Sequence, residues 1–75
     1  PQTLDTLPPG CRAIVVSLNA EGIERRRLLD LGFTQGSIVQ SVRKSPCGDP
    51  TAFRVRGATI ALRADQSRRI VVEPF

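Results

Sequence analysis

A chain of 75 residues is long enough for one domain with one small hydrophobic core, which argues against a deep enzymatic cleft. Eleven Arg and Lys against seven acidic residues give a net charge of +4, which suits nucleic acid, an acidic protein partner or simple solubility. Because there is no Trp, no Tyr and only three Phe, side chains that stack on bases are scarce, and this disfavours nucleic acid.

The first ten residues are polar and contain three prolines, with Leu4 and Leu7 as their only apolar anchors. We expect this stretch to lie along the surface. Residues 11–19 follow with the period-two alternation of a strand. One face of this strand carries Ile14, Val16 and Leu18, and the other face carries Val15 and Ser17.

Residues 23–31 form the only stretch with a helical pattern, and we predict one short α-helix there. Leu28 and Leu31 lie three residues apart on one face, and Gly32 supplies the left-handed residue that ends a helix. An isolated helix of about ten residues is marginal in water, so its leucines are predicted to dock on the strands and to form the centre of the fold. Ile23 is expected to act as an apolar staple, and Phe33 to fold back on the helix.

Four short strands are predicted after the helix. The first, over residues 37–44, has an unclean alternation that favours a β-bulge. The loop SPCGDP, residues 45–50, separates it from a hairpin in which strands 51–56 and 58–63 flank Gly57. The side chains that we expect to point inward in this hairpin are Phe53, Val55, Ile60 and Leu62. A short helical turn over 64–68 and a last strand over 70–72 complete the chain.

This order of elements favours a mainly β fold. We predict a small, partly open antiparallel barrel of about five strands, with one short inserted α-helix at about residues 23–31. No internal repeat or low-complexity segment divides the chain, so residues 1–75 are expected to form a single domain. No signal peptide and no membrane-spanning stretch is visible, which predicts a cytoplasmic protein with no membrane insertion.

Catalytic and metal-ligating side chains are scarce. The chain has no His, which removes the commonest general base and a frequent metal ligand. We therefore predict no catalytic residue and no enzymatic activity. Cys11 and Cys47, expected to be reduced thiols, cannot supply the four ligands of a structural zinc site. We expect no cofactor, although weak binding of Fe²⁺ or another divalent metal is conceivable, for instance at Cys47 and Asp49.

Three adjacent arginines, residues 25–27, are the sharpest surface feature of the sequence. The simpler interpretation is a solvated helix face, in which Arg26 pairs with Asp30 one turn later. The alternative is a patch that contacts an acidic protein surface or phosphate groups.

Several motifs in register resemble the FeoA-like domains of bacterial ferrous iron transport systems. They lie in the segments LLDLGFTQGS, SPCGDPTAFRVRG and TIALRADQSRRIVV, and the resemblance covers about residues 4–73. The matching positions are Arg25, Arg27, Leu28, Leu31, Gly32, Gly36, Pro46, Gly48, Asp49, Pro50, Ile60, Ala61, Leu62, Arg63, Ile70 and Val72. Three positions depart from the family pattern, where Gln35 replaces Pro, and Ser45 and Ser67 each replace Ala.

The resemblance implies an SH3-like barrel with a non-enzymatic, accessory or regulatory role in bacterial ferrous iron uptake. The implied partner is the cytosolic GTP-binding domain of a FeoB-type membrane transporter. The partner surface is then expected on the helix and the turn after it, at Arg25, Arg27, Leu28, Leu31 and Phe33. The second candidate surface is the SPCGDP loop, with Pro46, Cys47 and Asp49.

Two alternatives remain at this point. Similar SH3-like domains form the C-terminal part of iron-dependent (DtxR-like) transcriptional repressors, although the absence of a helix-turn-helix argues against a complete repressor. A small nucleic-acid-binding barrel is supported by the basic charge alone, and we expect no specific nucleic-acid binding.

Overall fold

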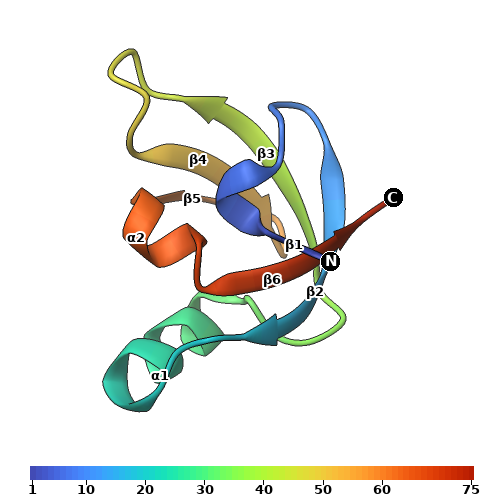
Figure 1. Ribbon diagram of the computed structural model, residues 1–75, viewed down its shortest axis with the longest axis vertical. Coiled ribbons are helices and arrows are strands. Elements are labelled where there is room, and N and C mark those ends of the chain that lie inside the picture. Colours follow the sequence, from blue (N-terminus) through green and yellow to red (C-terminus); the bar gives the residue numbers. More distant parts are fainter.

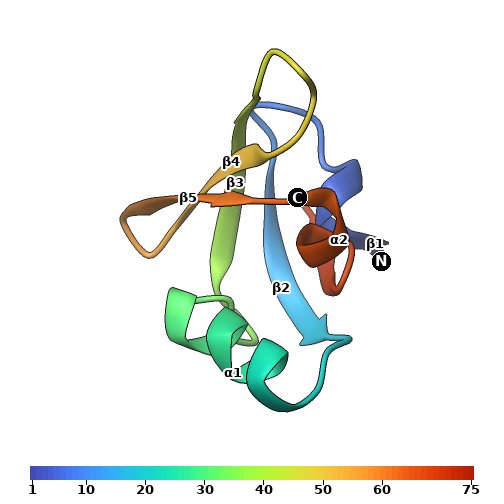
Figure 2. The same cartoon turned by 90° about the vertical axis from the view of Figure 1, so that its left-hand side faces the viewer.

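The computed structural model describes all 75 residues as one strongly curved antiparallel sheet with two helices attached (Figure 1). The strands are β1 (Gln2–Thr3), β2 (Arg12–Leu18), β3 (Ile38–Lys44), β4 (Thr51–Val55), β5 (Ala58–Leu62) and β6 (Ile70–Pro74). The helical elements are a short 3₁₀ turn, η1 (Leu4–Thr6), and the helices α1 (Gly22–Leu31) and α2 (Ala64–Ser67). The order across the sheet is β1-β6-β2-β3-β4-β5. The sheet curls into a barrel (Figure 2). The barrel stays open because its two edge strands, β1 and β5, do not pair.

The predicted mainly β architecture is confirmed, with six strands in place of about five. The additional strand, β1, pairs with β6 through Gln2 opposite Val72 and Thr3 opposite Val71. Two residues are too few to show a period-two pattern, so this strand has no signal in the sequence. The pairing also places Leu4 and Leu7 in the core, where they are 0% and 3% exposed.

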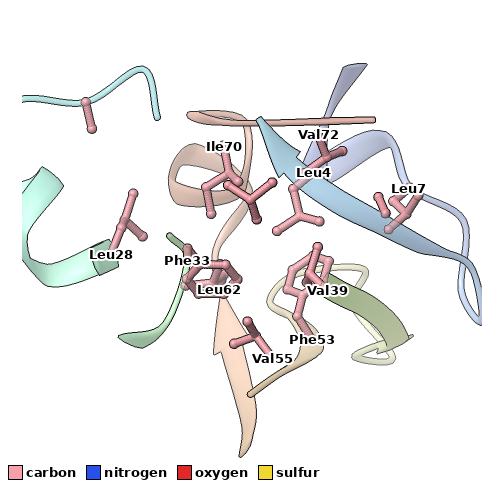
Figure 3. Close-up of a cluster of buried hydrophobic side chains, with 13 residues drawn as sticks. Leu4, Leu7, Leu28, Phe33, Val39, Phe53, Val55, Leu62, Ile70 and Val72 are labelled. Atoms are coloured by element: carbon pink, nitrogen blue, oxygen red, sulfur yellow. The ribbon is translucent and has the colours of Figure 1, made fainter. Parts of the chain in front are cut away.

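Thirteen buried apolar residues fill the barrel, and most of them are labelled in Figure 3. Phe33 and Phe53 are the largest fully buried side chains. The remaining members are Leu4, Leu7, Ala13, Val15, Ala20, Leu28, Val39, Val55, Leu62, Ile70 and Val72. Burial of this apolar surface, at about 25 cal/mol per Å², is the main favourable term in the folding of so small a domain.

The β4–β5 hairpin forms as expected. Phe53 and Val55 on β4 and Leu62 on β5 are buried, and Ile60 packs against the core as a half-buried side chain. The two residues of the turn, Arg56 and Gly57, have φ angles of 51° and 81°. Positive φ at both central positions defines a type I′ turn, whose twist matches that of antiparallel strands.

The face that β2 buries is the one with the smaller side chains. Ala13 and Val15 are buried, whereas Ile14 and Val16 are 40% and 38% exposed. A register shift between Val15 and Ser17 also breaks the simple alternation along this strand. The bulge predicted in β3 is confirmed by a register shift between Ser41 and Arg43.

The prediction that the helix leucines form the centre of the fold is wrong. α1 lies at one end of the barrel (Figure 1), and Leu28 is its only buried residue. Ile23 is 82% exposed, so it is not an apolar staple. The predicted end of the helix is confirmed, because Gly32 adopts the left-handed conformation with φ 110° and donates its N–H to the carbonyls of Leu28 and Leu29.

Candidate functional site

A hydrogen bond and an ion pair hold the N-terminal half of α1 to the barrel. The guanidinium of Arg25 donates to the carbonyl oxygen of Leu18 at the end of β2, at 3.3 Å. Glu24 forms an ion pair with Arg69 at 3.5 Å, and the N–H of Asn19 donates to the carbonyl oxygen of Arg69 at 2.6 Å. The predicted pair of Arg26 with Asp30 does not form, since the only ion pairs are this one and that of the N-terminal amine with Glu73.

One side of α1 presents an apolar and a basic side chain that the domain leaves uncovered, and it ends in Leu31, which packs in part against the core. Ile23, Arg27 and Leu31 are spaced four residues apart, so they lie along one side of the helix. Ile23 and Arg27 are exposed, Leu31 is half-buried, and the Arg27 guanidinium makes no hydrogen bond or ion pair. We call these three residues the α1 stripe.

The residues predicted for partner contact fall into two groups. Arg25, Arg27 and Leu31 reach the surface, whereas Leu28 and Phe33 are 2% and 0% exposed and belong to the core. Figure 3 shows Leu28 and Phe33 among the core side chains. These two side chains therefore pack α1 and the turn after it against the core, and a partner cannot contact them. Ile23, which the sequence analysis assigned a packing role, joins the exposed set.

Two hollows lie near the end of β2 and the turn after α1, and neither is lined by a residue of the α1 stripe. The first has a volume of about 230 Å³ and is lined by Val16, Ser17, Leu18, Arg25, Leu29 and Gln35. The second has a volume of about 490 Å³ and is lined by Thr34, Gln35, Gly36, Ser37, Ile38 and Arg56. Gln35 lines both, and only Ile38 among the lining residues of the larger hollow is hydrophobic. A polar lining of this kind is unlike the mostly apolar pockets that hold small molecules and suits contact with another protein.

The C-terminal end of α1 meets the turn of the β4–β5 hairpin. A Cβ placed on Gly32 would lie 2.9 Å from Cδ of Arg56, so the stem of this arginine covers the glycine closely. The position thus requires glycine for two reasons, the left-handed backbone and the lack of space.

The SPCGDP loop is tied to α2. A carboxylate oxygen of Asp49 accepts the backbone N–H of Ala64, the first residue of α2, at 2.8 Å. This carboxylate therefore caps a helix terminus fifteen residues away in the chain, a role that the sequence did not reveal. Pro46 and Cys47 are exposed on the same loop. Beside them, a hollow of about 600 Å³ is lined by Arg43, Lys44, Ser45, Pro46, Pro50, Ala52 and Ala61.

No three His, Cys, Asp or Glu side chains gather where they could hold a metal ion together. Cys11 and Cys47 are both exposed free thiols. The pairing of Cys47 with Asp49 as a weak metal site also competes with the hydrogen bond that Asp49 makes to α2. None of the helices has the length and apolar character to cross a membrane.

The small open barrel and its attached helix define a class, the small SH3-like β-barrel domains. The model of the FeoA domain family matches residues 2–74. The chain therefore belongs to the FeoA family, which is associated with ferrous iron transport.

Two curated relatives match over 70 residues each. The chain is 31% identical to the Fe(2+) transport protein A/Fe(2+) transporter FeoB fusion protein of Porphyromonas gingivalis, with 93% of this chain and 8% of the fusion protein covered. It is 30% identical to the putative Fe(2+) transport protein A of Campylobacter jejuni, with 93% and 95% covered. The chain thus spans a small part of the first relative and nearly all of the second.

Solved structures of the family have the same fold. FeoA of Stenotrophomonas maltophilia, a prokaryotic SH3 domain protein complexed with zinc, is 36% identical with a TM-score of 0.86, over 97% of this chain and 91% of that one. FeoA of Chlorobium tepidum is 35% identical with a TM-score of 0.91, over 99% and 70%. A manganese-dependent transcriptional repressor reaches a TM-score of 0.87 over 99% of this chain and 41% of its own, but at 16% identity it shows the fold alone.

Proposed function

We propose that this domain is a non-enzymatic accessory component of ferrous iron uptake that acts in the cytoplasm through contact with a FeoB-type transporter. The observation that carries the proposal is the likeness to the fusion protein, in which a sequence resembling 93% of this chain is joined to FeoB. Covalent linkage keeps two modules at a high effective concentration, which is useful when their function requires contact.

The contact surface that we propose consists of the α1 stripe, whereas Arg25 lies on the other side of the helix and bonds to the Leu18 carbonyl. Arginine next to exposed apolar side chains is the composition enriched at interface hot spots. Arg27 is free of any internal bond, and Ile23 buries little of its surface in the domain. Both side chains therefore contribute little to the stability of the barrel. A partner surface with acidic and apolar groups would complement both. The cytosolic GTP-binding domain of the transporter is the part that we expect to provide it.

A pair of matched variants tests this surface. Replacement of both Ile23 and Arg27 by Ala is expected to weaken binding to the transporter's isolated cytosolic domain at least tenfold, which is about 1.4 kcal/mol or more. The same double variant is expected to change the free energy of unfolding by less than about 1 kcal/mol, since both side chains are exposed. Calorimetric titration and urea unfolding on the same preparations measure the two quantities.

The control is Arg43→Ala, which removes an exposed arginine near the end of β3, outside α1 and its stripe. It is expected to leave the affinity within about twofold, because screened surface charges contribute little. Arg25→Ala is a less clean variant, since it also removes the bond to the Leu18 carbonyl. Unchanged affinity in the Ile23 and Arg27 double variant would contradict the proposed surface and favour the SPCGDP loop.

The repressor alternative rests on fold alone. The repressor structures match at 16 to 18% identity, while the FeoA structures from Chlorobium tepidum and Stenotrophomonas maltophilia match at 35% and 36%. A repressor domain would require metal-dependent contact with a DNA-binding partner. Sub-micromolar, sequence-dependent binding of this domain itself to a DNA duplex at physiological salt would favour the nucleic-acid-binding alternative, whereas counterion release alone gives weak binding that salt abolishes.

A further inference from the structure

The free edge of β5 is the second surface of this domain that invites a partner. β5 is the last strand of the sheet, and its only pairing is with β4. In a two-residue type I′ hairpin, the residues that flank the turn form a hydrogen-bonded pair, and such pairs alternate along the ladder. Here Val55 is opposite Ala58, so Ala58, Ile60 and Leu62 direct their backbone groups toward β4. Thr59 and Ala61 therefore direct theirs outward.

These outward groups have no partner within the domain. No hydrogen bond from a backbone or a side chain joins Ala58–Leu62 to any segment other than β4. Thr59 and Ala61 are also exposed. The turn end of the β4–β5 hairpin points away from α2 and the N-terminal segment (Figure 2).

The β5 edge lacks the devices by which natural edge strands avoid pairing. Such strands are usually very short, bulged, or interrupted by proline or a charged residue. β1, at the other margin, contains only two residues. β5 has the sequence ATIAL, with no charge, proline or glycine, and pairs with β4 without a register shift. An unprotected edge of this kind is a template for an added strand.

Positive charge surrounds this edge and indicates what would pair with it. Arg54 lies opposite Thr59 on β4, Arg56 precedes the strand, and Arg63 follows it. None of the three forms an ion pair, because the only ion pairs involve the N-terminal amine and Arg69. The nearest acidic side chain along the chain, Asp65, lies in the first turn of α2, and Asp49 accepts a hydrogen bond from the backbone of α2.

A second copy of this chain fits the edge poorly. Antiparallel pairing of two β5 strands through Thr59 and Ala61 centres on Ile60, which places Arg63 of one copy opposite Gly57 of the other. Arg63 then lies beside the other copy's Arg56, twice in the dimer. Like charges brought together in this way disfavour association.

We propose that β5 binds an extended, acidic segment of a protein partner by strand addition, with the backbone groups of Thr59 and Ala61 as the main donors and acceptors. Arg54, Arg56 and Arg63 would then select acidic side chains on the added strand. This surface shares no residue with the α1 stripe, so it can exist whether or not α1 contacts a transporter.

The test uses a blocked synthetic peptide of about nine residues with alternating Val and Glu, a length that matches a typical strand. A second peptide with Lys in place of Glu is the charge control. Titration of each into the ¹⁵N-labelled domain is expected to shift the amides of Thr59 and Ala61 with the Glu peptide and to leave them unmoved with the Lys peptide. Added salt is expected to weaken the binding.

Ala61→Pro separates strand addition from mere charge attraction. Proline at this position removes an N–H that points away from β4, so the hairpin ladder stays intact. We expect at least about tenfold weaker peptide binding than in the wild type, while Ala61→Val, which keeps the N–H, binds as the wild type does. Unfolding curves of both variants establish that the fold persists.

Equal binding by Ala61→Pro, or no binding of the Glu peptide at millimolar concentration, would overturn the proposal. Protection of the Thr59 and Ala61 amides that increases with protein concentration, without peptide, would overturn it in favour of a second copy. Loss of α1 binding to the transporter domain has no bearing on these outcomes, so the two surfaces fail independently.

Discussion

α1 and the β4–β5 hairpin have similar lengths but opposite roles in the fold. α1 contains ten residues and buries one side chain, Leu28. The two hairpin strands also contain ten residues in total, five each, and bury Phe53, Val55 and Leu62. Alternation with period two gives each strand a continuous buried face, whereas the helix sits at the end of the barrel and contacts it along a narrow side.

The two regions are also held in different ways. The hairpin is held by its ladder and its core side chains, while α1 depends on bonds at its N-terminal half and on the contact of Gly32 with Arg56. A helix that is attached without contributing much to the core leaves most of its surface free for another molecule. This difference is why we assign the partner surface to α1.

The largest expected effect is on the core side of this comparison. Phe53→Ala removes a fully buried ring and is expected to lower the free energy of unfolding by about 3–5 kcal/mol, close to the whole stability of so small a core. Ile23→Ala is expected to change it by less than about 0.5 kcal/mol. Urea unfolding of the two variants provides the comparison. A large loss for Ile23→Ala would mean that α1 is part of the folding core after all.

A second experiment examines the point where the two regions meet. Gly32→Ala is expected to cost about 1–3 kcal/mol, because alanine is strained at φ 110° and its Cβ crowds the Arg56 stem. In an Arg56→Ala background only the backbone strain remains, so the same substitution should cost measurably less. A double-mutant cycle by thermal unfolding measures this coupling. Equal costs in both backgrounds would show that the stem does not restrict the site.

A smaller effect is expected from the polar bond that fastens the SPCGDP loop. Asp49→Ala removes the acceptor of the Ala64 N–H and is expected to cost about 1 kcal/mol. Asp49→Asn keeps an oxygen acceptor at this position and should retain most of the stability. The two unfolding midpoints are compared under the same conditions. If both variants lose the same amount, the carboxylate charge matters more than the hydrogen bond.

The smallest effect concerns metal. Neither α1 nor the hairpin contains a cluster of metal-ligating side chains, so a chelator is expected to shift the unfolding temperature by less than about 2 °C. A decrease of more than about 5 °C, equivalent to roughly 1 kcal/mol in a domain of this size, would reveal a structural metal site. The relevant measurement is a thermal scan with and without chelator.

The sequence was most informative where a pattern repeats. The hairpin, the end of α1 at Gly32 and the bulge in β3 follow from local alternation and turn chemistry. It was uninformative where both faces of a strand carry apolar residues. Ile14 and Val16 alternate with Ala13 and Val15 on β2, and hydrophobicity alone cannot say which pair is buried. The packing of the barrel selects the smaller pair.

The candidate surface was harder to predict because it depends on which helix side chains remain exposed after α1 packs on the barrel. The family resemblance pointed to α1, but it could not separate Leu28, which is buried, from Ile23, which is exposed. The bond from Asp49 to Ala64 joins segments fifteen residues apart and has no local signature. Arg26 and Asp30 are correctly spaced for an ion pair, but exposed pairs on a helix contribute only about 0.3–0.5 kcal/mol and need not form.

The central claim is that the strands supply most of the core that stabilises the fold, while α1 provides the surface that contacts the partner. Mapping of amide shifts in the ¹⁵N-labelled domain, upon addition of the cytosolic domain of a FeoB-type transporter, tests it directly. The claim predicts that the perturbed amides cluster over residues 22–31 and at the adjoining end of β2. Perturbations confined to residues 45–50, or none at concentrations where the two proteins form a complex, would contradict it.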